Sequence, residues 1–225
     1  MIAVNFSSVP QPLKVGIGLH DSSAALVPYI HSFQIPYVLI STGTWSISLN
    51  PFNQSVLTDA ELKQDCLCYI SYTGNPIKAS RLFAGNEHEQ EIKKLAQQFN
   101  QPADYFKNVE FNVVIYKNLI ESGSLLNADT YEEAYHQVIF NIIQKQVTST
   151  NLVLHNADVD QIFVDGGFSN NPVFMHFLAA AYPNKKVFAA TLSQASSLGA
   201  AMAIHSHWNT QPIPNQLVQL KQYFY

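Results

Sequence analysis

The stretch Gln161-Ile-Phe-Val-Asp-Gly-Gly-Phe-Ser-Asn-Asn-Pro172 decides how this chain of 225 residues should fold. Its apolar run, Ile162 to Val164, is typical of a buried strand. The paired glycines that follow, Gly166 and Gly167, allow a positive φ and the close approach of another group. Asn171 and Pro172 then predict a helix start, with Asn as the N-cap. This order leaves free N–H groups at the helix mouth, which predicts a seat for a nucleotide, although an ordinary tight turn has the same pattern.

Upstream of this stretch the sequence favours strands. We expect strands over Lys14–Leu19, Tyr37–Ile40 and Trp45–Leu49, and the last two flank a glycine turn as in a hairpin. These three strands should form an antiparallel meander. Ser80 is a candidate cap for a helix through Phe99, with a break in its apolar periodicity at Gly85-Asn86.

Downstream the pattern alternates between helix and strand. Helical spacing of apolar residues is clearest from Thr130 to about Asn151. A further strand is predicted over Lys186–Ala189, and a last helix from about Ser193 to Trp208, rich in small residues that allow close packing. Antiparallel strands followed by alternating helices and parallel strands predict an α/β fold with a sheet covered on both faces.

Composition excludes several classes of partner. The formal net charge is −4 and no cluster of lysine and arginine occurs, which argues against nucleic acid. Hydrophobic residues make up 47% of the chain and charged residues only 12%, as expected for a large sheet core or for an apolar surface that meets a partner. No signal peptide and no run of transmembrane length is evident, so we expect a cytoplasmic protein without membrane contact.

Cys66 and Cys68 are the two cysteines of the chain. On a strand they would point to the same face. A pair with this spacing lacks the further ligands of a zinc site, so two reduced thiols in the core are predicted.

Four stretches together resemble the FGGY family of carbohydrate kinases. Gly18-Leu-His-Asp-Ser-Ser-Ala-Ala25 resembles its general-base segment, and Ser41-Thr-Gly-Thr-Trp-Ser46 its second phosphate loop. Val164-Asp-Gly-Gly-Phe-Ser-Asn170 is similar to its adenosine motif. Leu192-Ser-Gln-Ala-Ser-Ser-Leu-Gly-Ala-Ala201 is similar to its closing helix. The resemblance implies a ribonuclease-H-like domain, as in actin, with three antiparallel strands and then alternating helices and parallel strands.

The resemblance covers only the second of the family's two lobes. It implies a nucleotide-binding domain over residues 14–208, preceded by an arm or interlobe connection at 1–13 and followed by a tail at 209–225. The acidic phosphate motif Asp-x-Gly-Thr of the first lobe does not occur in this sequence. The expected partners are therefore a small-molecule sugar, ATP with Mg²⁺, and the N-terminal kinase lobe. An apolar face bared without that lobe suggests self-association, such as a homodimer.

The resemblance also assigns roles to residues. Asp21 is the expected general base, since a carboxylate at a strand end can accept a hydroxyl proton; by position alone it could simply cap the next helix. Its neighbour His20 is expected to pack or to orient. Thr42, Gly43 and Thr44 are expected to contact the β- and γ-phosphates through hydroxyls and backbone N–H groups, where the alternative is a plain hairpin turn.

The adenosine site is expected at the glycine turn. Gly166 and Gly167 should form the wall beneath ribose and adenine, with Asn170 reaching a base edge, although Asn170 and Asn171 could exchange the roles of ligand and cap. Gln194 stands where relatives often carry glutamate, and its contact with nucleotide is open. Magnesium is expected on the nucleotide phosphates, and no protein ligand is assigned to it.

The function implied is ATP-dependent phosphorylation of a sugar hydroxyl. The His-Asp pair and the Ser-Thr-Gly-Thr-Trp loop resemble the rhamnulokinase and fuculokinase branch, which points to a ketose or deoxyketose. The alternative is a non-catalytic fragment that binds a nucleotide or a partner without turnover. Another member of the actin-like superfamily is a third possibility.

Overall fold

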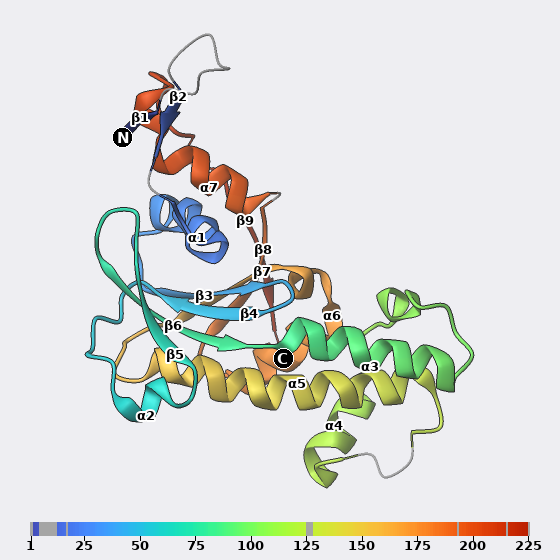
Figure 1. Cartoon of the computed structure of the whole chain (residues 1–225). Coiled ribbons are helices and arrows are strands. Elements are labelled where there is room, and N and C mark those ends of the chain that lie inside the picture. The colour runs from blue at the N-terminus through green and yellow to red at the C-terminus, as the bar shows by residue number, and fades with distance from the viewer. Residues whose placement is uncertain are drawn as a thin grey trace.

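The computed structural model describes residues 2–4, 13–16, 18–124, 128–192, 194–214 and 216–224. Seven strands of the described chain form one sheet (Figure 1): β3 (Tyr37–Thr42), β4 (Ser46–Asn50), β5 (Cys66–Ile70), β6 (Pro76–Leu82), β7 (Gln161–Gly166), β8 (Lys186–Thr191) and β9 (Gln219–Tyr223). Their spatial order is β5-β6-β4-β3-β7-β8-β9. Strands β3 to β6 are antiparallel to their neighbours, with β6 inserted between β4 and β5, and β7 and β8 then continue the sheet parallel to β3. The predicted α/β fold is confirmed.

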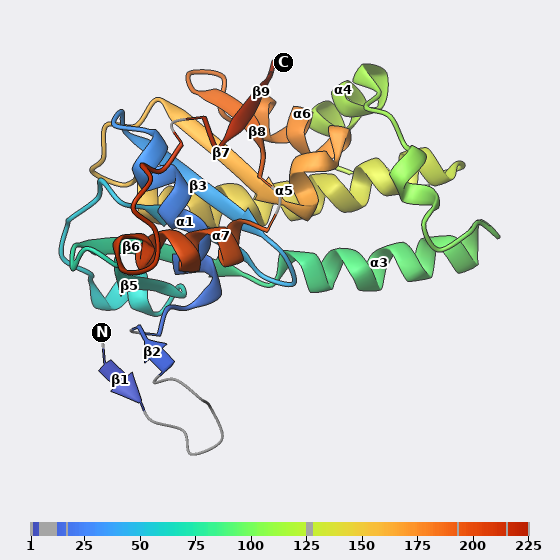
Figure 2. The ribbon, with the colours of Figure 1, turned by 90° about the horizontal axis from the view of Figure 1, so that it is seen from above.

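The first strand of the predicted meander is wrong. Strand β2 (Leu13–Val15) pairs only with β1 (Ile2–Val4), in a separate two-stranded sheet. This hairpin extends away from the main sheet (Figure 2). The antiparallel strands of the main sheet are instead β3, β4, β6 and β5. The prediction failed because a local pattern indicates extended backbone but not the strand with which it pairs. The segment 1–13, predicted as an arm, contains β1, and Ile17 lies outside the described residues.

Helices cover both faces of the sheet (Figure 1). Their bounds are α1 (Asp21–Ser32), α2 (Asp59–Leu62), α3 (Ala84–Gln98), α4 (Val113–Ser122), α5 (Tyr131–Leu154), α6 (Pro172–Ala181) and α7 (Ala195–Ala203). Helices α1 and α7 lie on one face, and α3 and α5 run side by side on the other (Figures 1 and 2). No helix in the described ranges is both long and apolar enough to span a bilayer.

The side chains of the central strands alternate between the two faces of the sheet, which divides the core into two clusters. In β3, Val38 and Ile40 join the larger cluster under α5 and α6, while Tyr37 and Leu39 join the smaller cluster under α1. Phe163 of β7 faces α1 as well. Successive side chains of a strand point to opposite faces, so both faces of the central strands are apolar, as expected of a sheet with helices on each side.

A polar seam joins β4 to α5 within this core. Ser46 donates a hydrogen bond of 2.6 Å to Gln146, and the hydroxyls of Ser48 and Thr150 lie 2.9 Å apart. This strand alternates small hydroxyl residues with large apolar ones. Its small hydroxyl residues let the long helix α5 approach the sheet, and their polar atoms are satisfied across the interface.

Several predicted boundaries change in the structure. Ser80 does not cap a helix, because it lies in β6 and donates to the carbonyl of Ser149 at 2.7 Å. Helix α3 begins at Ala84 and includes Gly85 and Asn86 without a break. The last helix ends at Ala203 rather than Trp208, and its predicted first residue, Ser193, lies outside the described residues.

The tail and the cysteines also differ from expectation. The segment 209–225, predicted as a tail, contains β9, which pairs antiparallel with β8 at the edge of the sheet. Cys66 is buried and reduced in the core, but Cys68 of the same edge strand is exposed. At an edge only part of a strand is covered, so same-face residues need not share burial.

The small-residue stripe of α7 packs directly on α1. A Cβ added at Gly199 would lie 1.8 Å from the carbonyl oxygen of Ala24, which leaves no room for any side chain. The contact confirms that the small residues of this helix allow close packing. It also joins the helix that carries Asp21 to the C-terminal helix.

We expect Gly199→Ala to lower the free energy of unfolding by about 1–3 kcal/mol, because the new methyl group must push two helix backbones apart. The intrinsic helix propensity of alanine, about 1 kcal/mol better than glycine, acts in the opposite direction. Urea unfolding measures the difference. Ser197→Ala, at an exposed position of the same helix, is the control and should be neutral or slightly stabilising. Equal stability of the two variants would contradict the close contact between Gly199 and Ala24.

Candidate active site

Two strand ends meet at one edge of the sheet and position the candidate site. Strands β3 and β7 are parallel neighbours, with Thr42 opposite Gly166 in the register. Because parallel strands end at the same edge, the loop after β3 and the glycine turn after β7 lie side by side. This arrangement brings together two segments that lie more than a hundred residues apart in the sequence.

Gly166 is required by its contact with Thr42. Its φ is +84°, and a Cβ there would lie 1.9 Å from the Thr42 carbonyl oxygen. The Thr42 hydroxyl donates to the carbonyl of Asp165 at 2.5 Å and accepts from the N–H of Phe168 at 3.0 Å. Thr42 is only 6% exposed. Its hydroxyl therefore fastens the glycine turn to the end of β3.

The loop after β3 is fixed from the other side by the start of α3. A Cβ at Gly85 would lie 1.8 Å from the Gly43 carbonyl oxygen. The N–H of Asn86 donates to the carbonyl of Thr44 at 3.1 Å, and Gly43 donates its own N–H to Trp45 at 2.8 Å. The break in periodicity at Gly85-Asn86 marks this close approach rather than the end of a helix.

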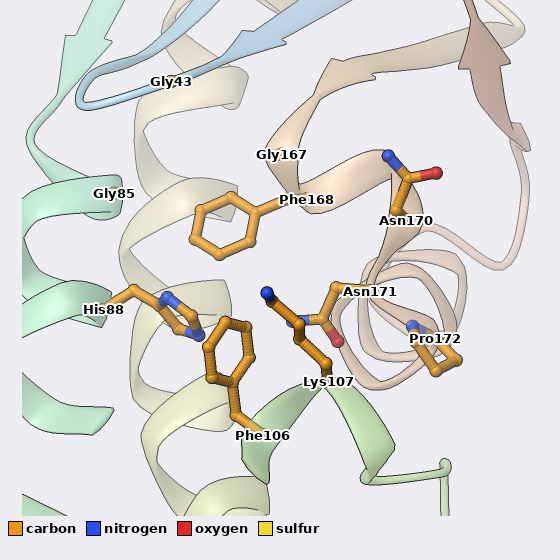
Figure 3. Close-up of a pocket in the computed structure, with 10 residues that line it drawn as sticks. All are labelled: Gly43, Gly85, His88, Phe106, Lys107, Gly167, Phe168, Asn170, Asn171 and Pro172. Carbon is orange, nitrogen blue, oxygen red and sulfur yellow. The ribbon is translucent and has the colours of Figure 1, made fainter. Parts of the chain in front are cut away.

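A cavity of about 550 Å³ opens beside this junction and is here called the Gly167 cavity (Figure 3). It is lined by Gly43, Gly85, His88, Phe106, Lys107, Gly167, Phe168, Asn170, Asn171 and Pro172. An added Cβ at Gly167 would meet no atom within 4 Å, so this glycine borders open space. The Phe106 and Phe168 rings lie on either side of His88, each edge-on to it at 5.1 and 5.3 Å between centroids. The cavity thus has a flat, largely aromatic wall.

A buried hydrogen-bond chain supports this wall. His88 Nε2 lies 3.0 Å from the Tyr135 hydroxyl, which accepts from the Asn171 side-chain amide at 2.7 Å. Burial lowers the pKa of His88 to about 4. His88 is therefore neutral at physiological pH, and the cavity gains no positive charge from it.

The two asparagines have different surroundings. Asn171 accepts from the N–H of Phe174 at 3.1 Å, as the N-cap of α6, and its amide nitrogen is bound to Tyr135. Asn170 is exposed and makes no side-chain hydrogen bond to any described residue. Of the two, Asn171 is the cap, and Asn170 is available to a ligand at the cavity rim (Figure 3).

A second cavity, of about 580 Å³, is here called the Asp21 cavity. It is lined by His20, Asp21, Ser22, Ser41, Thr42, Gly43, Thr44, Trp45, Ile47, Tyr69, Arg81 and Ser196. Gly43 borders both cavities, so the two adjoin at the loop after β3. The structure therefore brings Asp21, the Thr42–Thr44 loop and the Gly167 turn to two cavities that share Gly43.

Asp21 is the first residue of α1, with His20 as the N-cap. Its Oδ1 accepts from the Ser22 N–H at 2.7 Å and lies 2.8 Å from Nδ1 of His20. The Asp21 side chain is 78% exposed, and Oδ2 receives no hydrogen bond from the described residues. His20 also stacks on Tyr69 at 5.9 Å between ring centroids. One carboxylate oxygen is thus held in place, while the other is free of hydrogen bonds from the described residues in a side chain that lines the cavity.

Not every predicted group is free to bind a ligand. Gly166 does not line the Gly167 cavity, because it packs against Thr42. The Thr42 hydroxyl and the Gly43 N–H are both used within the turns. Thr44, in contrast, is exposed at the cavity. Gln194 is exposed, lies in the left-handed region at φ 58°, and lines neither cavity.

Several residues that line the cavities carry no recognisable sequence signal. Phe106 and Lys107 lie in a short 3₁₀ segment (Tyr105–Asn108) within a region without clear periodicity. His88 lies inside α3, where its pattern is that of an ordinary core residue. Arg81, at the end of β6, had no motif around it. These residues reach the site through tertiary structure, and no local signal marks them.

The described residues contain no group of three or more His, Cys, Asp and Glu side chains that could hold a metal ion.

Residues 34–212 match the family described as carbohydrate kinase FGGY, C-terminal domain. The chain belongs to the FGGY family of carbohydrate kinases. The match includes the loop after β3 and the glycine turn after β7, and it begins downstream of Asp21. No curated protein matches the sequence.

Solved structures agree with the family in fold. A xylulose kinase from Rhodospirillum rubrum superposes with a TM-score of 0.71 at 13% identity, covering 99% of this chain and 50% of that one. A carbohydrate kinase from Novosphingobium aromaticivorans gives 0.66 at 21% identity, covering 92% and 48%. A gluconate kinase from Lactobacillus acidophilus gives 0.55 at 16% identity, covering 84% and 42%. The chain has the ribonuclease-H-like fold of an FGGY C-terminal domain and spans about half the length of these kinases.

We expect Thr42→Val to lower the free energy of unfolding by about 1–3 kcal/mol, because it leaves the buried N–H of Phe168 without an acceptor. Thr44→Val makes the same chemical change two residues away at an exposed position and should alter stability by less than about 0.5 kcal/mol. Urea unfolding of both variants measures the contrast. Similar losses in the two would mean that the Thr42 hydroxyl does not fasten the turn.

Proposed function

We propose that this chain is the nucleotide-binding lobe of an ATP-dependent carbohydrate kinase and supplies its general base, Asp21. The observation that carries the proposal is the junction of two cavities at Gly43. One is walled by aromatic rings and a glycine, and the other contains an exposed carboxylate. A nucleotide lying across Gly43 would have its base in the first cavity and its terminal phosphate in the second.

The Gly167 cavity suits an adenosine. The rings of Phe106 and Phe168 offer apolar surface, and Gly167 lets a flat group lie against the backbone. Asn170 has a free amide that can donate to and accept from a base edge. Lys107, whose amino group points into the cavity in Figure 3, provides a positive charge near the ribose and phosphates.

The Asp21 cavity suits the chemistry of phosphoryl transfer. In the proposed step the acceptor hydroxyl oxygen forms a bond to the γ-phosphorus, and the bond from that phosphorus to the β–γ bridging oxygen breaks. ADP leaves with the electron pair, and the hydroxyl proton passes to the Asp21 carboxylate. Thr44 offers an exposed hydroxyl to the phosphates on the way. Mg²⁺, carried on the phosphates, would neutralise their charge.

The acceptor is proposed to be a ketose or deoxyketose such as rhamnulose or fuculose. Support comes from the His20-Asp21 pair and the Ser41–Trp45 loop, which resemble that branch of the family and which line the same cavity. The chain would act with an N-terminal lobe that holds the sugar, as a cytoplasmic enzyme. A second candidate is a chain that binds a nucleotide or a partner without turnover.

We expect Gly167→Val to weaken ADP binding at least about tenfold while leaving the unfolding midpoint unchanged. The new side chain would enter the cavity, where it meets no protein atom, and would occupy the space of the nucleoside. Isothermal titration calorimetry of Mg·ADP into the chain measures the affinity. Ala60→Val introduces the same side chain at an exposed site on α2 and is the control. Unchanged ADP affinity in Gly167→Val would place the nucleotide elsewhere.

We expect Asp21→Asn to lower sugar-dependent ADP release by about 10²- to 10⁴-fold, since the amide cannot accept the hydroxyl proton. ADP affinity should stay within twofold of the wild type. The assay combines the chain with a separately produced N-terminal lobe and screens ketoses as acceptors. Wild-type turnover that Asp21→Asn leaves intact would remove Asp21 as the base. Turnover by the chain without the added lobe would refute the half-enzyme interpretation.

A further inference from the structure

Arg81 is a cation at the Asp21 cavity to which the sequence assigned no role. It lies near the end of β6 and lines the cavity together with Asp21, Thr44 and Trp45. It is the one lysine or arginine among the described residues that line this cavity. Its presence beside an exposed carboxylate gives the cavity both a proton acceptor and a positive charge.

The Arg81 guanidinium is held in one orientation by Asp65. Nε and Nη2 of Arg81 donate to Oδ1 of Asp65 at 3.1 and 2.5 Å, and the Arg81 backbone N–H donates to the Asp65 carbonyl at 3.1 Å. Asp65 itself has a φ of 64°, a left-handed conformation that fixes the turn before β5. These hydrogen bonds raise the pKa of Arg81, so it stays charged.

Trp45 supports the guanidinium from a second direction. Cζ of Arg81 lies 5.6 Å from the centroid of the Trp45 ring, and Trp45 in turn contacts Phe83 at 4.5 Å between centroids. Stacking on an aromatic face is typical of arginine and leaves the edge of the guanidinium free to donate. Nη1 makes no hydrogen bond to any described residue, so this edge is available to a ligand.

The surroundings of Arg81 place its positive charge close to the proposed reaction. Asp65 holds the guanidinium through Nε and Nη2 but is not among the residues that line the cavity. Tyr69 lies within reach of the fields of Arg81, Asp65 and Asp21: burial raises its pKa, Arg81 opposes this, and the two carboxylates add to it. The charges of Arg81 and Asp21 thus both influence the pKa of Tyr69.

We propose that Arg81 binds the terminal phosphoryl group of ATP and stabilises the charge on it during transfer. This inference rests on the proposed function. A phosphate that passes Gly43 and Thr44 from the Gly167 cavity enters the cavity where Arg81 presents its free N–H groups. Guanidinium geometry matches two phosphate oxygens at once. During transfer, charge is spread over the equatorial oxygens of the γ-phosphoryl group, which is where a fixed arginine is most effective.

The test compares ATP with ADP. Calorimetry with the whole chain and Mg²⁺ should show that Arg81→Gln weakens ATP binding by about 10- to 100-fold, the range for a hydrogen bond to a charged group. ADP affinity should stay within twofold, which also shows that the variant is folded. Arg81→Lys should bind ATP with intermediate affinity, since it keeps the charge and loses the fork. Lys93→Gln removes an exposed cation on α3 and should change neither affinity.

The outcomes separate the two proposals. Selective loss of ATP affinity in Arg81→Gln supports the role of Arg81. Equal loss of ATP and ADP affinity, or no loss of either, overturns the role of Arg81. Neither outcome contradicts the proposed function of the chain. A wild-type chain that binds neither nucleotide overturns the proposed function and the role of Arg81 together.

Discussion

The site depends on one contact, the approach of Gly166 to the end of β3. No side chain fits between Gly166 and the carbonyl of Thr42, and the Thr42 hydroxyl closes the gap with two hydrogen bonds. This contact sets the spacing of two neighbouring turns at the sheet edge. Everything that lines the two cavities is positioned relative to those turns. The glycine and the threonine act as one structural unit, although they lie on different strands.

The loop after β3 is restrained from two sides. Gly166 packs on Thr42, and Gly85 packs on Gly43, so the backbone of the loop lies between the β7 turn and the start of α3. Loops that bind phosphate work best when their N–H groups and hydroxyls are already in place, because less ordering is needed on binding. Here Gly166 and Gly85 supply this restraint, because neither carries a Cβ that would keep the neighbouring backbone at a distance.

Much of the fold was predictable because its signals are local. The capped start of α6 at Asn171, the periodic helix α5 and the strand before Gly166 are all encoded within about twenty residues. The partner of a strand is not local, and for this reason the hairpin of β2 with β1 and the role of β9 at the edge were missed. Pattern indicates that a segment is extended, and only packing decides where it pairs.

The residues of the site also divide into those with a local sequence signal and those without one. Asp21, Thr44 and Gly167 carry recognisable motifs and do line the cavities. Gly166 and Thr42, predicted as ligands, also shape the turn: a Cβ at Gly166 would clash with Thr42, and the Thr42 hydroxyl is hydrogen-bonded within the turn. A motif cannot distinguish a residue that touches a ligand from one that shapes the wall, so their contact with a nucleotide stays a prediction. Phe106, Lys107 and Arg81 lie in segments without a motif. They reach the site by folding, and no short pattern could have identified them.

The contact of Gly199 with Ala24 has a mechanical consequence. Helix α1 begins with Asp21, and α7 carries Ser196, which lines the same cavity. At Gly199 the two helix backbones touch, so the helices cannot slide past one another at this point. A tilt of one must carry the other with it, so the carboxylate and Ser196 keep their separation whenever this face of the sheet shifts as a block.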